Sequence, residues 1–173
     1  MKFTQSILEA ASWIKEGHVI CYPTEGVWGI GSLNHPQLIK KIGKIKKRDL
    51  NKKFILLFDS LDSLGSKYKI KQKYLIRAKK YEYSFTTIVF PTPEGDSVAA
   101  RVPSFKTLKQ LLKAVGEEII STSANISGND VCKNVTEIKT HFGSEVYGVL
   151  NLKLQGQTKP STIIDIKRNE VIR

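Results

Sequence analysis

Segments whose apolar residues recur at helical spacing alternate with short, continuously apolar segments along the chain. Residues 7–14 place apolar side chains on one face of a helix, and residues 18–22 then have the composition of a buried strand. Interleaved helices and apolar strands predict an α/β fold, in which helices flank a central sheet. Residues 85–90 and 98–102 form two predicted strands with no helix between them, which predicts a mixed sheet.

The ends of two helices carry recognisable signals. Ser6 and Glu9 have the spacing of a capping box at the start of the first helix, and Gly17 follows its end. Ser104 is the expected N-cap of a later helix that Gly116 closes. The other predicted helices begin at Pro36, cover residues 70–80 and run over residues 136–143, and the other predicted strands cover residues 54–58, 118–121, 146–150, 162–166 and 170–172.

The length of 173 residues suits one domain with a hydrophobic core, and 40% of the residues are hydrophobic. No apolar run reaches the roughly 18 residues that a membrane-spanning helix needs, and the N-terminus lacks the apolar block of a signal peptide. We therefore expect a cytoplasmic protein with no membrane partner. Cys21 and Cys132 have no metal-site spacing, so we expect free thiols and no metal held by protein side chains.

The net charge of +12 concentrates in two stretches. Eight of the fourteen residues from 40 to 53 are basic, and another seven basic residues lie between positions 67 and 80. A positive charge of this size favours polyanionic partners such as nucleotides or nucleic acid. Charge alone leaves two interpretations open, a phosphate-binding surface or a solvated lysine-rich surface.

Small polar clusters follow several of the predicted strands. Residues 22–31 contain three closely spaced glycines, but they match neither the dinucleotide-binding nor the P-loop pattern, and by themselves they read as a loop. Residues 121–128 and 159–162 are rich in hydroxyl groups and contain one amide, at Asn125. Arg101 ends a predicted strand and could pair with a carboxylate through two hydrogen bonds.

These residue types suit anion binding. Hydroxyl and amide donors hold phosphate, carbamate or carboxylate oxygens without adding charge. No paired carboxylates and no nucleophile beside a histidine stand out in the sequence, so acid–base hydrolysis and covalent catalysis are not indicated. An ordinary polar turn remains an alternative for each cluster taken singly.

Four motifs in order support a specific resemblance. They are Tyr22-Pro23-Thr24-Glu25 with its glycines, Lys46-x-Arg48 with Lys52, Ser121-Thr122-Ser123-Ala124-Asn125-x-Ser127-Gly128, and Pro160-Ser161-Thr162. With the weaker match Arg101-Val102-Pro103, they make the chain resemble the short bacterial form of the threonylcarbamoyl-AMP synthase family. The resemblance implies one YrdC-like domain over residues 1–173, with a twisted, open, mixed sheet, flanking helices and a basic concave cleft.

The resemblance also implies an activity, that of a nucleotidyltransferase. Members of this family make threonylcarbamoyl-AMP and pyrophosphate from L-threonine, bicarbonate and ATP, and they work with Mg²⁺. A downstream threonylcarbamoyl-transferase complex moves the product to an adenosine beside the tRNA anticodon. Direct contact between this chain and tRNA is a further expectation, compatible with its basic surface.

By the same resemblance, functional residues carry over to positions of this chain. The catalytic set is Lys46, Arg48 and Asn125. The ATP-binding set is Lys46, Arg48, Lys52, Ser97, Ser123 and Asn125. The threonine-binding set is Thr24, Arg101, Ser121 and Ser161, with Arg101 on the carboxylate of threonine. The resemblance supplies no protein base for the carboxylation step.

Four single positions and one three-residue stretch depart from the family pattern. Asp49 stands where proline is usual, Lys53 replaces a proline or glycine, and Ser32 stands where cysteine is common. Leu57 occupies the place of a histidine that longer members carry. Tyr83-Ser84-Phe85 replaces a Pro-Gly-Pro stretch, which is expected to reshape one wall of the cleft.

Three alternatives remain beside this interpretation. One is a carbamoyl-handling relative, similar to a domain of the hydrogenase-maturation carbamoyltransferases. Another is a basic RNA-binding module that stacks bases on tyrosines interleaved with charges, namely Tyr68, Tyr74, Tyr81 and Tyr83. The last is an α/β domain with a lysine-rich surface and no activity.

Overall fold

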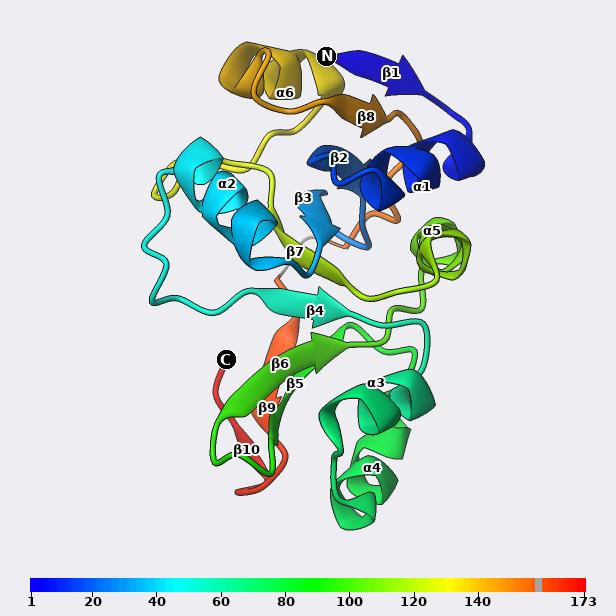
Figure 1. Cartoon of the computed structure of the whole chain (residues 1–173), viewed down its shortest axis with the longest axis vertical. Coiled ribbons are helices and arrows are strands. Elements are labelled where there is room, and N and C mark those ends of the chain that lie inside the picture. The colour runs from blue at the N-terminus through cyan, green and yellow to red at the C-terminus, as the bar shows by residue number, and fades with distance from the viewer. Residues whose placement is uncertain (158–159) are drawn as a thin grey trace.

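A ten-stranded β-sheet forms the centre of the computed structural model, which describes residues 1–157 and 160–173 (Figure 1). The strands are β1 (Lys2–Thr4), β2 (Ile20–Pro23), β3 (Trp28–Leu33), β4 (Ile55–Leu57), β5 (Thr86–Pro91), β6 (Ser97–Arg101), β7 (Ile119–Ser123), β8 (Gly148–Leu150), β9 (Thr162–Asp165) and β10 (Glu170–Val171). The helices are α1 (Ile7–Lys15), α2 (Pro36–Lys46), α3 (Leu61–Tyr68), α4 (Gln72–Ala78), the 3₁₀ helix η1 (Lys79–Tyr81), α5 (Lys106–Val115) and α6 (Val135–Phe142). Lys159, which opens the predicted 159–162 cluster, lies outside the described residues.

The sheet is mixed, as the sequence predicts. Its strand order is β1-β8-β2-β3-β7-β4-β6-β5-β9-β10. Strand β8 pairs in parallel with β1 and β2, β4 with β6, and β5 with β9, whereas the remaining neighbours are antiparallel. The predicted α/β class and mixed sheet are confirmed.

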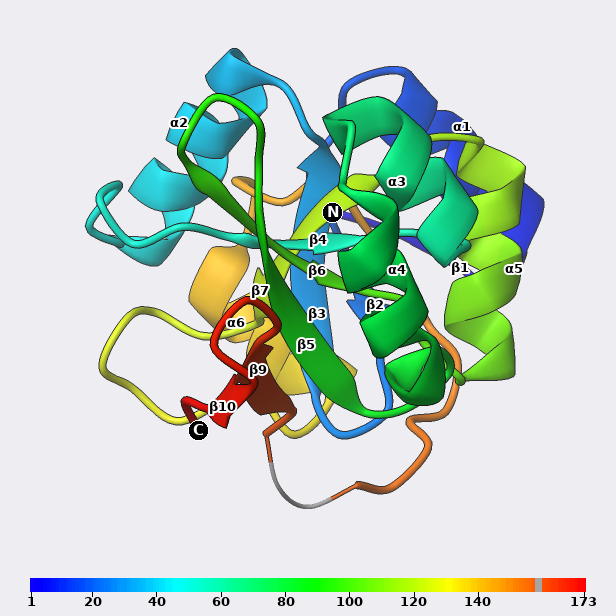
Figure 2. The same ribbon diagram turned by 90° about the horizontal axis from the view of Figure 1, so that it is seen from below.

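Helices cover both faces of this sheet. One hydrophobic cluster joins α1 and α5 to side chains of β2, β4 and β7, and the other joins α2, α3, α4 and α6 to the opposite face. In Figure 2, α2 and the α1–α5 pair lie on opposite sides of β3 and β7. None of the helices in the described residues is long and apolar enough to cross a bilayer.

The start of α1 follows the sequence signal with one change. The Ser6 hydroxyl accepts the Glu9 amide at 3.3 Å, as a capping box requires. The reciprocal bond runs through Thr4, because the Ser6 amide donates to its hydroxyl oxygen at 2.9 Å and that hydroxyl donates to the Glu9 carboxylate. Gly17 follows the helix with φ of 79°, a conformation in which glycine avoids the Cβ strain of other residues.

Other predictions were wrong at particular positions. Ser104 is not the cap of α5, because the helix begins one residue later than predicted and its N-cap, Phe105, makes no side-chain hydrogen bond. The predicted helix over residues 70–80 is α4 followed by the tighter turn η1. Helix α3 escaped prediction because only its Leu61 and Leu64 mark a buried face over two turns.

The largest difference is β3, where the sequence indicates a glycine-rich loop. Trp28–Leu33 is instead a central strand that pairs with β2 and β7 over four and five residue pairs. Its glycines are needed for packing, because a Cβ on Gly31 would overlap the Ile120 carbonyl oxygen and lie 2.5 Å from Tyr22 Oη. The missing side chains make room for the buried Tyr22 ring against the sheet.

This packing gives a stability prediction. Gly31→Ala should lower the free energy of unfolding by about 2–3 kcal/mol, because backbone and a buried ring surround the added methyl group. Gly43→Ala is the matched control: it meets mainly the flexible side chain of Leu50, which is exposed, and alanine favours the helix by up to about 1 kcal/mol. Urea unfolding of both variants measures the difference, and equal effects would contradict this account.

Candidate functional site

Four of the predicted site residues lie on one face of the sheet. Ser97 and Arg101 are four residues apart on β6, and Ser121 and Ser123 are two apart on β7, so each pair projects from a single face. Strand β4 lies between them, and its Leu57 pairs with Arg101 on one side and with the residue two before Ser121 on the other. The register therefore places hydroxyls and a guanidinium on one surface.

The Lys46 side chain is the centre of the first half of the site. Lys46 is the last residue of α2 and is only 1% exposed. Its ammonium nitrogen donates to the Ser123 carbonyl at 2.5 Å, the Asn125 carbonyl at 2.6 Å and Asn125 Oδ1 at 3.0 Å. An ammonium group has three N–H donors, so these oxygens account for all of them.

The loop after β7 is built around that ammonium. The Ser123 hydroxyl donates to Asn125 Oδ1 at 2.7 Å, and Asn125 Nδ2 donates to the Asn129 carbonyl at 2.7 Å. The Ser127 amide donates to the main-chain carbonyl of Lys46 at 2.8 Å. Lys46, Ser123 and Asn125, which the resemblance assigns to one ATP site, are therefore brought together in one network.

Burial changes the acidity of this lysine. Removal from water, helped by the charge of the nearby Arg48, lowers the pKa of Lys46 to about 8. The three oxygen acceptors favour the ammonium form, so at neutral pH the loop encloses a positive charge. The neutral side chain of Asn125 contacts this charge directly, and the Ser123 hydroxyl donates to the same amide oxygen.

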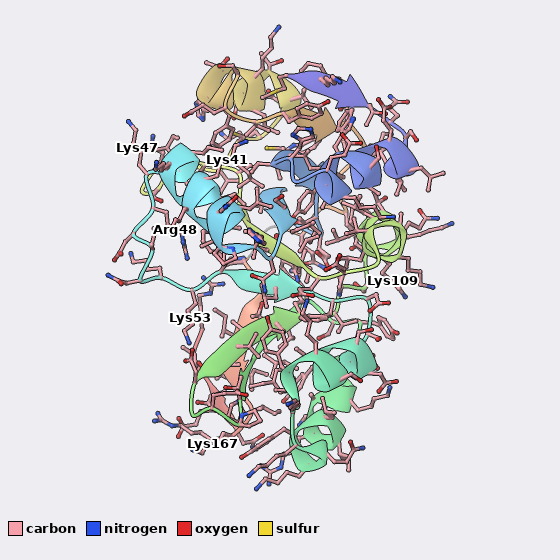
Figure 3. All side chains as sticks on the ribbon, in the orientation of Figure 1. Lys41, Lys47, Arg48, Lys53, Lys109 and Lys167 are labelled. Carbon is pink, nitrogen blue, oxygen red and sulfur yellow. The ribbon has the colours of Figure 1, made fainter. Side chains whose placement is uncertain are left out.

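Arg48 lies just beyond α2, where Lys47 turns the chain with φ of 49°. Its guanidinium donates to the carbonyls of Lys52 at 3.4 Å and Lys53 at 3.1 Å, and it lies 5.0 Å from the centre of the Phe54 ring. These contacts fold residues 48–53 into a loop. Figure 3 shows Arg48 and Lys53 on the segment between α2 and β4, at the end of the sheet opposite the labelled Lys109 of α5.

Lys53 links this loop to β6. Its ammonium forms an ion pair with Asp96 and donates to the Ser97 carbonyl at 2.9 Å. The Lys52 side chain is exposed. Arg48, Lys52 and Ser97 are thus connected through Lys53, a residue that sequence analysis treated only as a departure from the family pattern.

A second cluster forms around Arg101, which is 8% exposed. Its Nη2 lies 3.2 Å from Glu25 Oε2, and its guanidinium lies 5.0 Å from the centre of the Phe85 ring. Glu25 is 1% exposed. Burial raises the pKa of the neighbouring Tyr22 phenol above its ordinary value, and Ser121 and the Arg101 charge act in the opposite direction.

The other predicted threonine contacts take part in local bonds. The Thr24 hydroxyl donates to the Val27 carbonyl at 2.7 Å and so closes the turn between β2 and β3. The hydroxyl of Ser161, just before β9, lies 2.9 Å from that of Thr87 on β5 in a buried hydrogen bond. Ser121 is buried within β7, where it faces Gly31 and Ile55 on the neighbouring strands.

Sequence analysis missed Glu25, Tyr22 and Phe85 as members of the site. Glu25 was visible as a charged residue directly after a buried strand, but the following glycines read as a loop. Phe85 belongs to the Tyr83-Ser84-Phe85 departure and forms the wall behind Arg101 that this departure was expected to reshape. The Leu57 side chain is apolar and fully buried, so this position offers no polar group to a ligand.

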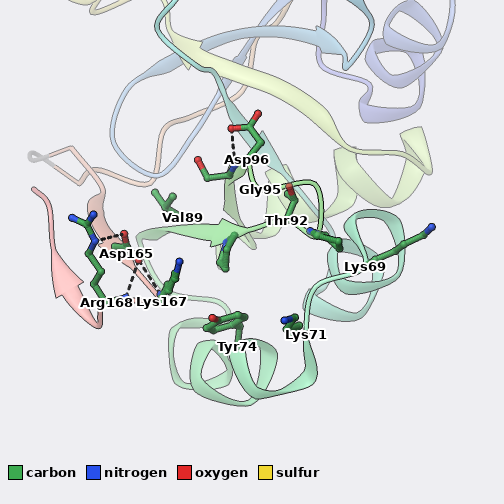
Figure 4. Close-up of a pocket in the computed structure, with 13 residues that line it drawn as sticks. Lys69, Lys71, Tyr74, Val89, Thr92, Gly95, Asp96, Asp165, Lys167 and Arg168 are labelled. Atoms are coloured by element: carbon green, nitrogen blue, oxygen red, sulfur yellow. Dashed lines mark hydrogen bonds and ion pairs between the residues drawn. The ribbon is translucent and has the colours of Figure 1, made fainter.

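A basic groove lies beyond Ser97, between α4 and the turn joining β9 to β10 (Figure 4). Two adjoining hollows of about 450 and 520 Å³ share Lys167 and Arg168. We define the basic groove by its six cations, Lys69, Lys71, Arg77, Lys80, Lys167 and Arg168. The RNA-binding alternative stacks bases on four tyrosines, but Tyr74 is buried, Tyr68 and Tyr81 are half-buried, and Tyr83 alone of the four is exposed.

Across residues 1–157 and 160–173, no three His, Cys, Asp or Glu side chains gather closely enough to hold a metal ion. The donor set at the site consists of cations, hydroxyls and one amide beside a single glutamate. Those groups suit oxygen-rich anions in the first cluster and a charged organic molecule in the second.

The Sua5/YciO/YrdC family model, described as "Telomere recombination", matches residues 12–173. Proteins named threonylcarbamoyl-AMP synthase are similar over the full chain: that of Pseudoalteromonas translucida is 31% identical, with 100% of both chains covered, and that of Vibrio campbellii is 29% identical, with 99% of its own length covered.

Solved structures are similar too. The crystal structure of P. abyssi Sua5 complexed with L-threonine is 25% identical with a TM-score of 0.78, over 95% of this chain. The present chain spans only 53% of that Sua5 chain. E. coli YciO is 23% identical with a TM-score of 0.76, over 95% of this chain and 87% of its own, and shows the same fold.

The Lys46 network gives a stability prediction. Lys46→Met should lower the free energy of unfolding by about 2–4 kcal/mol at neutral pH, because two buried carbonyls and an amide oxygen lose their donor. Lys44→Met, an exposed change on the same helix, is the control and should cost little.

The same pair of variants has a pH signature. The folded chain releases the Lys46 proton near pH 8, whereas the unfolded chain holds it to about 10.5. The stability of the wild type relative to Lys46→Met should therefore rise between these values, by up to about 1.4 kcal/mol per pH unit. A difference that stays flat from pH 7 to 10 would contradict the lowered pKa.

Proposed function

Because the chain belongs to the Sua5/YciO/YrdC family, we propose that it makes threonylcarbamoyl-AMP and pyrophosphate from L-threonine, bicarbonate and ATP. The observation that carries this proposal is the placement of two basic clusters along the neighbouring strands β7, β4 and β6. A buried cation under the Ser123–Asn125 loop suits a polyphosphate, and the buried Arg101 beyond it suits a carboxylate. A nucleotidyltransferase that joins an amino-acid derivative to AMP needs both.

The first half of the site is proposed to hold ATP. Arg48 and Lys52 supply charge at the mouth, and Ser97, Ser123 and Asn125 supply neutral donors. Lys46 acts through its charge and by shaping the loop, because all three of its N–H groups already have acceptors. Positioning and charge stabilisation are the main requirements of phosphoryl-type transfer.

The reaction at phosphorus then follows from these charges. An oxygen of the threonine carbamate forms a bond to the α-phosphorus as the bond from that phosphorus to the departing pyrophosphate oxygen breaks. Negative charge moves onto the pyrophosphate, where Arg48 and Lys52 stabilise it. Lys46, Arg48 and Asn125 form the proposed catalytic set.

Magnesium is proposed to arrive with the nucleotide. The cations, hydroxyls and amide of the first half fit a metal ion carried by phosphate oxygens and water, which is how Mg²⁺ is commonly held in nucleotide sites. When bound, it neutralises part of the triphosphate charge. The residues here would contact the phosphates beside it.

The second half of the site is proposed to hold threonine. Arg101 receives the carboxylate, and Thr24, Ser121 and Ser161 complete the pocket around the side chain. The proposed product is an activated threonyl carbamate that a downstream threonylcarbamoyl-transferase complex passes to tRNA. The threonine-bound Sua5 structure supports this half through its similar fold.

The activity test is pyrophosphate release by the purified chain with ATP and magnesium, omitting threonine or bicarbonate in turn. Release that needs both substrates is the expected result. Lys46→Ala and Asn125→Ala should each reduce the rate at least about 100-fold, because both changes open the loop that shapes the anion site.

Lys139→Ala, an exposed change on α6, is the control and should retain the wild-type rate. Circular dichroism of each variant separates lost chemistry from lost folding. Release without threonine would contradict the synthase, and release driven by carbamoyl phosphate would favour the carbamoyl-handling alternative.

Direct contact with tRNA is a second proposal, supported by the basic groove. Its six cations line two adjoining hollows, and the backbone phosphates of nucleic acid are the polyanion that such a lining suits. The groove adjoins Ser97 of the ATP half, so a bound tRNA would lie close to the place where the product forms.

The groove proposal predicts a salt-dependent interaction. The combined change Lys71→Ala, Arg77→Ala, Lys80→Ala and Lys167→Ala should weaken binding of an unmodified tRNA transcript and reduce the salt slope of log K by about three to four. Pyrophosphate release should continue. The control removes four exposed lysines elsewhere, at Lys15, Lys106, Lys113 and Lys139. Equal losses for both sets would show that total charge, and not the groove, determines binding.

A further inference from the structure

Buried polar atoms without partners gather in one place. In the described part of the chain, the buried side-chain nitrogen and oxygen atoms that lack a hydrogen-bond partner are Tyr22 Oη, both carboxylate oxygens of Glu25 and Arg101 Nε. These three residues belong to the same cluster, since Glu25 Oε2 lies 3.2 Å from Arg101 Nη2. Buried polar groups normally have partners, so this cluster points to a ligand with several polar groups.

The charges of the cluster specify what kind of ligand fits. A guanidinium and a carboxylate lie side by side, and both are almost completely shielded from solvent. An anion alone would be attracted by Arg101 but repelled by Glu25. A zwitterion, with an anionic and a cationic group on neighbouring atoms, meets an opposite charge at each end. An α-amino acid has this arrangement.

Holding Arg101 in place does not account for Glu25. The ion pair lacks hydrogen-bond geometry, because neither Glu25 oxygen has a hydrogen-bond partner in the described residues. Arg101 is already supported by the Phe85 ring at 5.0 Å. Burying two charges is costly when the ion pair between them lacks hydrogen-bond geometry. A bound ligand that forms hydrogen bonds to both Glu25 and Arg101 would offset this cost.

The backbone holds Glu25 at this point. Its carbonyl accepts the Gln157 amide at 2.8 Å, and the Thr24 hydroxyl closes the turn on which it lies. The next residue is Gly26, where a Cβ would lie 2.8 Å from the Gln157 carbonyl oxygen. The main chain is therefore fixed on both sides, and the carboxylate alone remains without partners.

We propose that Glu25 receives the α-ammonium group of the amino-acid substrate and accepts a proton from it. The inference rests on the proposed function, and it adds the group that prepares the amine for carboxylation. One N–H bond breaks, its electron pair remains on nitrogen as a lone pair, and an O–H bond forms on Glu25. The nitrogen lone pair of the neutral amine then forms a bond to the carbon of bicarbonate as the bond from that carbon to its hydroxyl oxygen breaks. The departing hydroxide takes one amine proton and leaves as water, which gives the carbamate.

The test compares two ligands that share a carboxylate and a hydroxyl group. L-threonine has the α-amine, and 3-hydroxybutyrate lacks it. Calorimetric titration of the full chain should show that Glu25→Gln weakens threonine binding at least tenfold and leaves 3-hydroxybutyrate binding unchanged or stronger. Glu118→Gln is the matched control, because it also alters a buried, ion-paired glutamate, and it should change neither affinity.

The outcomes separate the possibilities. Equal weakening of both ligands would make Glu25 a support for Arg101 and overturn the inference, as would no change in threonine binding. Failure of the wild type to bind threonine at all would overturn the proposed function as well. If Glu25→Gln does not fold, Glu25→Asp provides a second test, because it keeps the negative charge on a side chain one methylene shorter. It should also weaken threonine binding and leave 3-hydroxybutyrate binding unchanged.

A pH profile tests the proton transfer separately from binding. At saturating threonine, Glu25→Gln should release pyrophosphate slowly near neutral pH and recover as the pH rises, because more of the amino acid is then deprotonated in solution. The wild type should show a smaller dependence over the same range. Parallel profiles for the two proteins would leave Glu25 without a role in the proton step and would overturn that part of the inference.

Discussion

The organisation of the site depends on one buried ammonium group, that of Lys46. Taking a charge out of water is expensive, and here three oxygens of the 123–125 loop offset the cost with charge-assisted hydrogen bonds. The cation supplies donors to three oxygens of the loop, and the loop supplies the acceptors that the buried cation needs. The end of α2 and the end of β7 are therefore a single structural unit, although almost 80 residues separate them in the sequence.

The two halves of the site differ in how many of their polar atoms have hydrogen-bond partners within the protein. Around Lys46 each donor has an acceptor, which holds the geometry ready for an anion with little reorganisation. Around Arg101 and Glu25 several polar atoms lack partners, and their pairing is left to a bound molecule. A preorganised anion site can align the nucleotide for reaction. A neighbouring cluster whose polar atoms find partners only in a bound molecule can select the smaller substrate over similar molecules.

Much of this arrangement was accessible from sequence, for identifiable reasons. Helices α1, α2 and α5 have clear apolar periodicity. The motifs that contain Lys46 and Ser123-x-Asn125 were visible in the sequence, and the structure brings them together. Strand β3 was missed because its glycines serve close packing against Tyr22, a tertiary requirement that composition cannot distinguish from a flexible loop. The Glu25–Arg101 pair was missed for a related reason, since it joins the turn between β2 and β3 to the distant strand β6.

The shared face of β6 and β7 also limits how this chain can vary during evolution. Alternate residues of a strand point in opposite directions, so inserting one residue before Ser121 would send it and Ser123 into the hydrophobic layer beneath α2. Insertions of odd length are thus incompatible with the inner strands. The exposed loop at residues 49–52 can accept insertions of odd or even length, because its side chains do not alternate between two faces of the sheet. Length differences among relatives should accumulate there and at other exposed turns, while the strands that carry the hydroxyls keep a constant length.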